Sequence, residues 1–119
     1  MGDRANVYIR DGKSGVYLYT HWAGTTLPDI VRAALTRGRS RWDDGPYLTR
    51  IIFEEMIEDD MGSLTGYGIS SVLGDNEHPI IVVDCATQTI GFAKEGKEQI
   101  LHPITSFEEY VNGHINYET

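Results

Sequence analysis

Apolar and polar residues alternate on both sides of one short turn sequence, and this alternation limits the fold more than any other feature. It covers residues 5–21 around Asp11-Gly12-Lys13-Ser14-Gly15. A period of two with a glycine-containing centre predicts two antiparallel strands joined by a tight turn. With Asp11 opposite Val16, one face is aliphatic and a one-residue slip would spoil it. The other face then holds Arg4, Asn6, Tyr8, Tyr17, Tyr19 and His21.

Two helices are expected after this hairpin. Apolar residues recur at helical spacing across residues 27–35, with Thr26 as a cap and Gly38 at the end. The run Asp43-Asp44-Gly45-Pro46 then offers cap oxygens and an early proline. A second helix is therefore predicted from about Pro46 to Asp59.

Three further strands follow in the prediction. Tyr67 to Val72 has strand character after a loop, Gly62 to Gly66. The unbroken apolar run Ile80 to Val83 favours a central strand that is covered on both faces. Residues 84–89 then turn back into Ile90 to Ala93, which gives a second hairpin.

A short helix is the last predicted element. It is expected to begin at Thr105 or Ser106, where Glu108 or Glu109 can close a capping box, and to end near Asn112-Gly113. The resulting order, ββααβββα, predicts an α+β fold with two to three helices and a mainly antiparallel sheet of about five strands. At 119 residues, the chain is expected to form a single domain, 1–119.

The sequence also indicates a compartment. No apolar run approaches the roughly 18 residues that span a bilayer, and Asp3 and Arg4 interrupt any signal-peptide pattern. Cys85 is the only cysteine, so no internal disulfide can form, which agrees with a reducing environment. We therefore expect a cytoplasmic protein.

Charge is distributed unevenly along the chain. Residues 1–50 hold eight Lys and Arg against five Asp and Glu, whereas residues 51–119 hold two against thirteen. Such a division suits a charged partner. The pI near 4.8 argues against direct nucleic-acid binding by the whole molecule, because phosphate binding needs concentrated Lys and Arg. A protein partner with a basic surface fits the acidic second segment better.

The open end of the first hairpin is the best candidate for a ligand site. Antiparallel pairing should bring together an anion-holding guanidinium, a titratable imidazole and aromatic walls. The residues concerned are Asp3, Arg4, Asn6, Tyr19, His21 and Trp22. A small anionic or nucleotide-like ligand would suit them. The alternative is that Arg4 pairs with Asp3 or a distant carboxylate and that the aromatic rings are ordinary core residues.

The same region resembles a known group of proteins. Met1-Gly2-Asp3-Arg4-Ala5-Asn6-Val7, followed by Val16-Tyr17-Leu18-Tyr19-Thr20-His21-Trp22-Ala23-Gly24, is similar to small uncharacterised proteins of bacteria and their phages. These open with a short Arg-containing strand and then show a Tyr-x-His-Trp-x-Gly segment. The likeness extends through Arg41-Trp42-Asp43-Asp44 and Gly66-Tyr67-Gly68 to Val83-Asp84. It implies a bacterial or phage context, provides no catalytic residue to transfer, and draws attention to Arg4 and His21.

Two charged clusters have competing interpretations. The acidic cluster comprises Glu54, Glu55, Glu58, Asp59 and Asp60. On a helix it would contain like-charge pairs at i, i+4, relieved by a partner's basic patch, by a divalent cation or simply by solvent. The basic cluster comprises Arg32, Arg37, Arg39, Arg41 and Trp42. It can track a phosphate backbone, but arginines at a helix C-terminus more often complement the helix dipole.

Catalytic, metal and cofactor signatures are weak throughout. Cys85 lacks an evident activating base, and we expect a small half-buried residue at a strand end. The four histidines, His21, His78, His102 and His114, show no paired metal-ligand spacing. Gly66-Tyr67-Gly68 lacks the rest of a dinucleotide fingerprint and indicates a strand entry or bulge. No metal or cofactor is predicted.

Three hypotheses follow from the sequence. The first is a non-enzymatic acidic protein that docks on a basic protein surface, and in a phage this would suit inhibition of a host defence or nucleic-acid-handling protein. The second is a small-ligand protein or enzyme that uses the hairpin-end residues. The third is a homodimer joined through an aromatic strip of Tyr8, Tyr17 and Tyr19.

Overall fold

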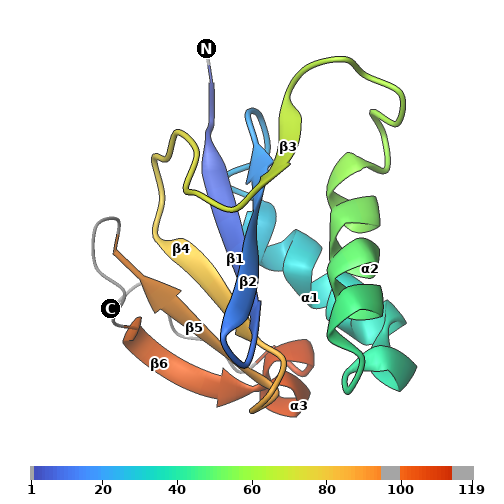
Figure 1. Ribbon diagram of the computed structural model, residues 1–119, viewed down its shortest axis with the longest axis vertical. Coiled ribbons are helices and arrows are strands. Elements are labelled where there is room, and N and C mark those ends of the chain that lie inside the picture. Colours follow the sequence, from blue (N-terminus) through green and yellow to red (C-terminus); the bar gives the residue numbers. More distant parts are fainter. Residues whose placement is uncertain (1, 95–99, 114–119) are drawn as a thin grey trace.

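The computed structural model describes residues 2–94 and 100–113. Figure 1 shows a twisted sheet with helices packed against one side of it. The elements are, in order, β1 (Ala5–Asp11), β2 (Ser14–Thr20), α1 (Leu27–Arg37), a single 3₁₀ turn η1 (Arg39–Arg41), α2 (Gly45–Ile57), β3 (Tyr67–Ser70), β4 (Ile80–Asp84), β5 (Thr89–Ala93), β6 (Ile100–Ser106) and α3 (Phe107–Val111). The predicted α+β class and the predicted order of the first elements are confirmed.

One mixed sheet of six strands forms the centre of the fold, in the order β3-β2-β1-β4-β5-β6. β1 and β4 run parallel, and every other neighbouring pair is antiparallel. The sequence predicted about five strands and missed β6. Pro103 lies inside that strand, and a proline argues against strand structure except at a sheet edge, which is where β6 lies.

The first hairpin forms as predicted, but its register differs by two residues. Asp11 lies opposite Ser14, not Val16, because the chain reverses within Gly12 and Lys13. Gly12 has φ +68°, a conformation that glycine adopts at little cost. A shift of two leaves every side chain on its predicted face, since side chains alternate with a period of two.

The main core lies between the sheet and the helices. Aliphatic residues of the first hairpin, such as Val7 and Leu18, are fully buried there against helix residues such as Val31 and Ile52. β4 is buried on both faces, as its unbroken apolar run predicts. Its residues Ile81 and Val83 join the main core, and Ile80 and Val82 pack on the opposite face with Tyr8, Tyr17, Leu73 and Ala93.

The helix termini follow their local sequence signals with two differences, and one strand also ends earlier than predicted. The Thr26 side chain does not cap α1, because its hydroxyl donates to the Ala23 carbonyl instead. Asp44 does cap α2, accepting a hydrogen bond from the Tyr47 backbone. α2 ends at Ile57, earlier than the predicted Asp59, and β3 ends at Ser70, earlier than Val72.

The short α3 has the capping box expected from its sequence. Ser106 accepts a hydrogen bond from the Glu109 backbone while the Glu109 side chain accepts from the Ser106 backbone. Gly113, with φ +84°, follows its C-terminal end.

Candidate functional site at the open end of the first hairpin

The predicted juxtaposition of Arg4 and His21 is present. The Asp3 backbone donates to the His21 carbonyl at 2.7 Å, which extends the hairpin beyond the last strand pair. A Cβ placed on Gly2 would lie 3.1 Å from His21 Nε2 and 3.2 Å from Arg4 Cγ, so both side chains flank the same point. Because alternate residues share a face, Asn6 and Tyr19 lie on that side as well.

A row of aromatic side chains crosses this end of the molecule. The Tyr19 hydroxyl and His21 Nδ1 are 2.9 Å apart. The His21 ring meets Trp22 edge to face, with centroids 5.6 Å apart, and Trp22 meets Tyr67 of β3 in the same manner at 5.8 Å. Edge-to-face contacts of this kind hold aromatic rings in fixed orientations. Trp22 nevertheless remains 47% exposed.

Gly66 holds the indole ring of Trp22 against the start of β3. Its φ of +94° favours glycine, and a Cβ at this position would overlap the six-membered ring of Trp22. The Gly66 carbonyl also accepts a 2.8 Å hydrogen bond from the His21 backbone. The sequence indicated a strand entry at Gly66-Tyr67-Gly68. In the structure, Gly66 also packs against the exposed side chain of Trp22.

Tyr67 connects the aromatic row to the acidic cluster. Its hydroxyl donates a 2.6 Å hydrogen bond to the Asp60 carboxylate. Burial raises the pKa of Tyr67, and the hydrogen bond and charge of Asp60 raise it further, to about 12. Sequence reasoning treated the hairpin end and the acidic cluster as separate sites. No local sequence pattern could reveal the contact between Tyr67 and Asp60, because it depends on how the loop after α2 positions β3.

The acidic cluster divides into two parts. Glu54 and Glu55 accept hydrogen bonds from Arg37, and Glu54 also accepts one from Arg50, so basic residues of the same chain relieve their repulsion. Glu58 and Asp59 lie beyond the end of α2 and are exposed. Each predicted like-charge pair, Glu54 with Glu58 and Glu55 with Asp59, therefore has one member outside α2.

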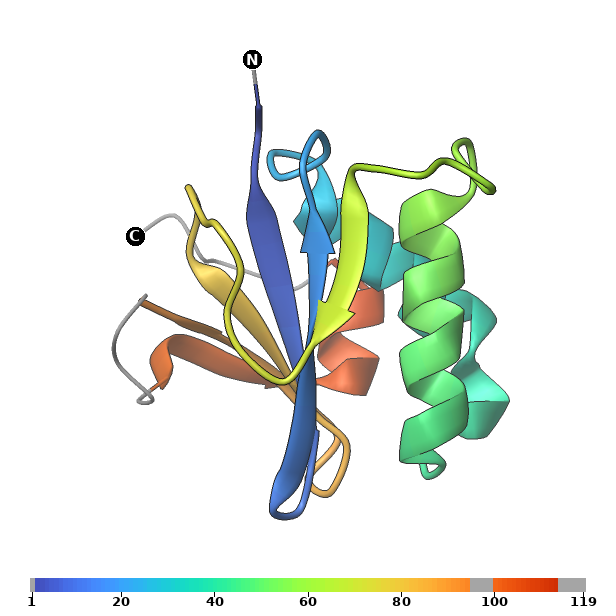
Figure 2. The ribbon, with the colours of Figure 1, turned by 45° about the horizontal axis from the view of Figure 1, so that its top comes forward.

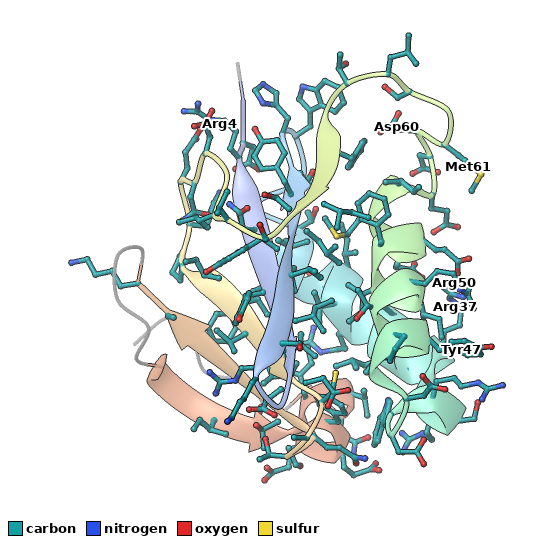
Figure 3. The ribbon with its side chains drawn as sticks, viewed as in Figure 1. Arg4, Arg37, Tyr47, Arg50, Asp60 and Met61 are labelled. Carbon is teal, nitrogen blue, oxygen red and sulfur yellow. The ribbon has the colours of Figure 1, made fainter. Side chains whose placement is uncertain are left out.

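Exposed apolar side chains follow the acidic residues in the loop to β3. Met61 is 73% exposed and Leu64 is 99% exposed. Figure 3 shows Asp60 and Met61 beyond the end of α2, whereas Tyr47 and Arg50 of α2, and Arg37 of α1, lie below them. This loop leads directly to Tyr67 of the aromatic row, and contiguous exposed apolar area is typical of an interaction surface.

Arg4 is held by distant carboxylates. Its Nε donates to Glu77 at 2.5 Å, and one Nη lies 3.4 Å from Asp75. The hydrogen bond from Arg4 lowers the pKa of Glu77. This is the pairing that the sequence analysis weighed as the alternative to ligand binding. A phosphate or carboxylate ligand would have to compete with both partners for the guanidinium.

Asn6 is fully buried and its amide is satisfied within the protein. Its nitrogen donates to the Asp75 carbonyl at 2.9 Å and to the Asn76 side chain at 3.2 Å, and its oxygen accepts from the Gly74 backbone. These contacts fasten the connection between β3 and β4 where it crosses the outer face of the first hairpin (Figure 2). The observed contacts of Asn6 are thus those of a structural residue.

Asp3 points away from Arg4 and binds a different set of groups. One carboxylate oxygen accepts from the Thr25 backbone at 2.8 Å, and the other lies 2.5 Å from His78 Nε2. The hydrogen bonds from Thr25 and then from His78 lower the pKa of Asp3 to about 2. The structure therefore groups Arg4, Tyr19, His21 and Trp22, and it places Asp3 in a separate contact.

Contacts within the chain also engage the predicted basic cluster. Arg32 donates to Asp29 and to the Tyr110 carbonyl. Arg39 donates to Glu108 and stacks over Trp42, whose indole N–H donates to the Leu35 carbonyl. Arg41 lies over the Tyr47 ring. Arg32, Arg39 and Arg41 thus each have partners within the fold.

Cys85 lies directly after β4 and is buried. Burial raises the pKa of its thiol to about 11, with smaller contributions from Asp11 and Asp84. A neutral thiol is a poor nucleophile. Of the other histidines, His102 lies in β6, and His114 lies outside the described residues. Residues 2–94 and 100–113 include no group of three potential metal-ligating side chains.

The aromatic strip proposed as a dimer contact is partly used within the fold. The Tyr8 and Tyr17 rings contact each other with centroids 4.5 Å apart and pack with Leu73. Both are half-buried.

Among the described residues, no helix is long and apolar enough to cross a membrane.

Comparison of the chain with protein-family models, curated proteins and solved structures finds no match.

Proposed function

We propose that this protein is a small acidic binding protein that docks on a basic partner protein through one end of its fold. The docking surface comprises Trp22, Asp59, Asp60, Met61, Leu64 and Tyr67. The observation that supports it best is the half-exposed Trp22, which packs against Gly66 and Tyr67, while Tyr67 in turn binds the carboxylate of Asp60 in the loop that carries the exposed Met61 and Leu64.

The composition of this surface resembles that of protein interfaces. Their central residues are enriched in Trp, Tyr and Met, and charged groups lie at the rim. Here Trp22 and Met61 offer exposed apolar area, and Asp59 is an exposed acid two residues before Met61 in the chain. The ordered Trp22 ring would lose little conformational freedom on binding, which favours affinity.

Charge decides the kind of partner. Residues 51–93 contain no Lys or Arg, so nothing in this segment neutralises its carboxylates. Arginines of the first 50 residues pair with Glu54, Glu55, Asp75, Glu77 and Asp84, whereas within residues 2–94 and 100–113 no ion pair engages Glu58 or Asp59, so these two carboxylates can attract a basic surface. Such attraction speeds association and selects against acidic partners.

The resemblance to small bacterial and phage proteins supports a setting for this role. In a phage, an acidic surface of this kind suits inhibition of a host defence or nucleic-acid-handling protein. No assembled catalytic set is needed for such an activity. A role as a small-ligand protein receives less support, because Arg4 and Asn6 are engaged within the fold.

Affinity capture from a bacterial host lysate tests the proposal. We expect the wild-type protein to retain a specific basic protein and Trp22→Ala to lose most of it. Tyr47→Ala is the matched control, because Tyr47 is 49% exposed, close to the 47% of Trp22, and lies at the start of α2, away from the docking surface. Equal capture by Trp22→Ala and wild type would show that this surface is not used.

A further inference from the structure

The edge of the sheet beside the docking surface is open. In the described part of the chain, β3 pairs with β2 alone and forms one end of the strand order. The loop that contains Asp60 and Met61 leads directly into β3. An edge strand presents unpaired backbone groups to any strand that approaches it.

The direction of these groups follows from one hydrogen bond. The His21 backbone donates to the Gly66 carbonyl at 2.8 Å, so Gly66 faces β2. Backbone groups alternate along an antiparallel ladder. Gly68 and Ser70 therefore also face β2, and the N–H and C=O groups of Tyr67 and Ile69 point outward.

β3 is a short edge strand of four residues, but it lacks the charged and proline residues that protect many edges. Its sequence, Tyr67–Ser70, includes neither a charged residue nor a proline. Ile69 is 61% exposed, and Val72, just beyond the strand, is 66% exposed. β6 at the other edge has Pro103, which has no backbone N–H to offer. The two edges thus differ in their readiness to accept another strand.

We propose that the partner binds by adding an extended segment with basic residues to the β3 edge. This inference rests on the proposed docking function and specifies its geometry. Side chains of the added strand would alternate between two faces. On the face of Tyr67 and Ile69 they would meet the carboxylates of Asp59 and Asp60 at one end and an exposed isoleucine at the other.

Charge complementarity selects this occupant over a second copy of the chain. Each copy has a formal net charge of −8, and pairing two β3 edges would bring the acidic segments of both copies together. A segment that combines Lys or Arg with β-branched residues would satisfy the carboxylates, cover Ile69 and complete the ladder. The small residues Gly68 and Ser70 leave the opposite face of the edge unobstructed.

The probe for the test is a labelled extended peptide in which every second residue is Lys in one half and Val in the other, with Thr between them, and an N-methylated copy that cannot complete the ladder. Binding is measured by fluorescence anisotropy at low salt, and hydrogen exchange is followed at the Tyr67 and Ile69 amides. We expect binding with slowed exchange at both amides, and roughly tenfold weaker binding of the N-methylated peptide.

Two variants distinguish the contribution of the Ile69 backbone N–H to peptide binding from the contribution of its side chain. Ile69→Pro removes an outward N–H without removing a bond to β2, and Ile69→Thr keeps the N–H and a β-branched side chain. We expect Ile69→Pro to bind the peptide roughly tenfold more weakly than Ile69→Thr. If Ile69→Pro does not fold, the N-methylated peptide still gives the comparison.

Three outcomes would overturn strand addition. Peptide binding that Asp59→Asn weakens, with no protection of the two amides, would leave the docking function intact and reject the edge. Failure of the peptide to bind would reject a basic strand as the occupant of the edge. The affinity capture with Trp22→Ala would still test the docking function separately. Amide protection that rises with protein concentration alone would identify a second copy as the occupant.

Discussion

The Tyr67 hydroxyl donates a 2.6 Å hydrogen bond to the Asp60 carboxylate, and this contact joins two regions that are separate in the sequence. Through Tyr67, the acidic residues that follow α2 become neighbours of Trp22. One end of the molecule thereby combines an exposed indole, exposed carboxylates and exposed apolar side chains. The proposed docking function depends on this combination.

The Tyr67–Asp60 contact should be visible in the ionisation of Tyr67. Burial and the nearby carboxylate raise its pKa to about 12, so Asp60→Asn should lower this pKa while burial keeps it above the ordinary value of 10.0. Ultraviolet titration of wild type and variant, with Tyr67→Phe to assign the signal, measures the shift. A wild-type Tyr67 that ionises at the ordinary value would refute the contact.

Gly66 should be intolerant of a side chain. Gly66→Ala places a Cβ into the Trp22 ring and strains a backbone with φ +94°, so we expect a loss of about 1 kcal/mol or more in the free energy of unfolding. Trp22 fluorescence should change as well. Gly68→Ala is the control, since no atom lies within 4 Å of a Cβ placed there. Equal stability of the two variants would mean that Gly66 does not position Trp22.

Asn6 should matter for stability because it fastens the crossing connection. Asn6→Ala removes the hydrogen bonds that a fully buried side chain makes to the backbones of Gly74 and Asp75, and at about 0.5–1.5 kcal/mol per bond this should cost about 1–3 kcal/mol in the free energy of unfolding. The exposed Asn112→Ala should change it by less than about 0.5 kcal/mol. Urea unfolding compares the two. An unaffected Asn6→Ala protein would show that these hydrogen bonds contribute little.

Asp3 should make stability depend on pH in the acidic range. Its pKa is lowered from 3.8 to about 2 in the folded protein, so its contribution is complete above 3.8 and is lost as the pH falls toward about 2. Asp3→Asn should therefore be less stable than wild type near neutral pH, with a difference that shrinks across this window. Urea unfolding at a series of pH values measures the difference, and a constant difference would contradict the assigned contacts.

Local patterns predicted much of the fold. The hairpin faces follow from alternation, and the cap at Asp44 and the capping box at Ser106 follow from short-range hydrogen bonding. The hairpin register and β6 were predicted less well. Alternation of apolar and polar residues cannot distinguish two registers that differ by two residues. The proline at position 103 is atypical of a strand, so β6 could not be recognised from the sequence pattern.

The candidate site could be predicted only in part. Pairing within one hairpin was enough to place Arg4 near His21 and Tyr19. The partners of these residues come from loops far along the chain: Glu77 for Arg4, Tyr67 for Trp22 and Asp75 for Asn6. Tertiary packing sets such contacts, and no spacing in the sequence encodes them.

The most direct test of electrostatic docking is the salt dependence of binding to the captured basic protein. Raising the salt from about 0.05 M to 0.5 M shortens the Debye length from roughly 14 Å to 4 Å. We predict that the wild-type affinity falls steeply over this range and that Asp59→Asn lowers both the affinity and its salt dependence. Asp43→Asn removes an equal charge at the other end of α2, roughly 20 Å away, and should do neither. Binding that is insensitive to salt, or equally affected by the two variants, would contradict the proposed docking surface.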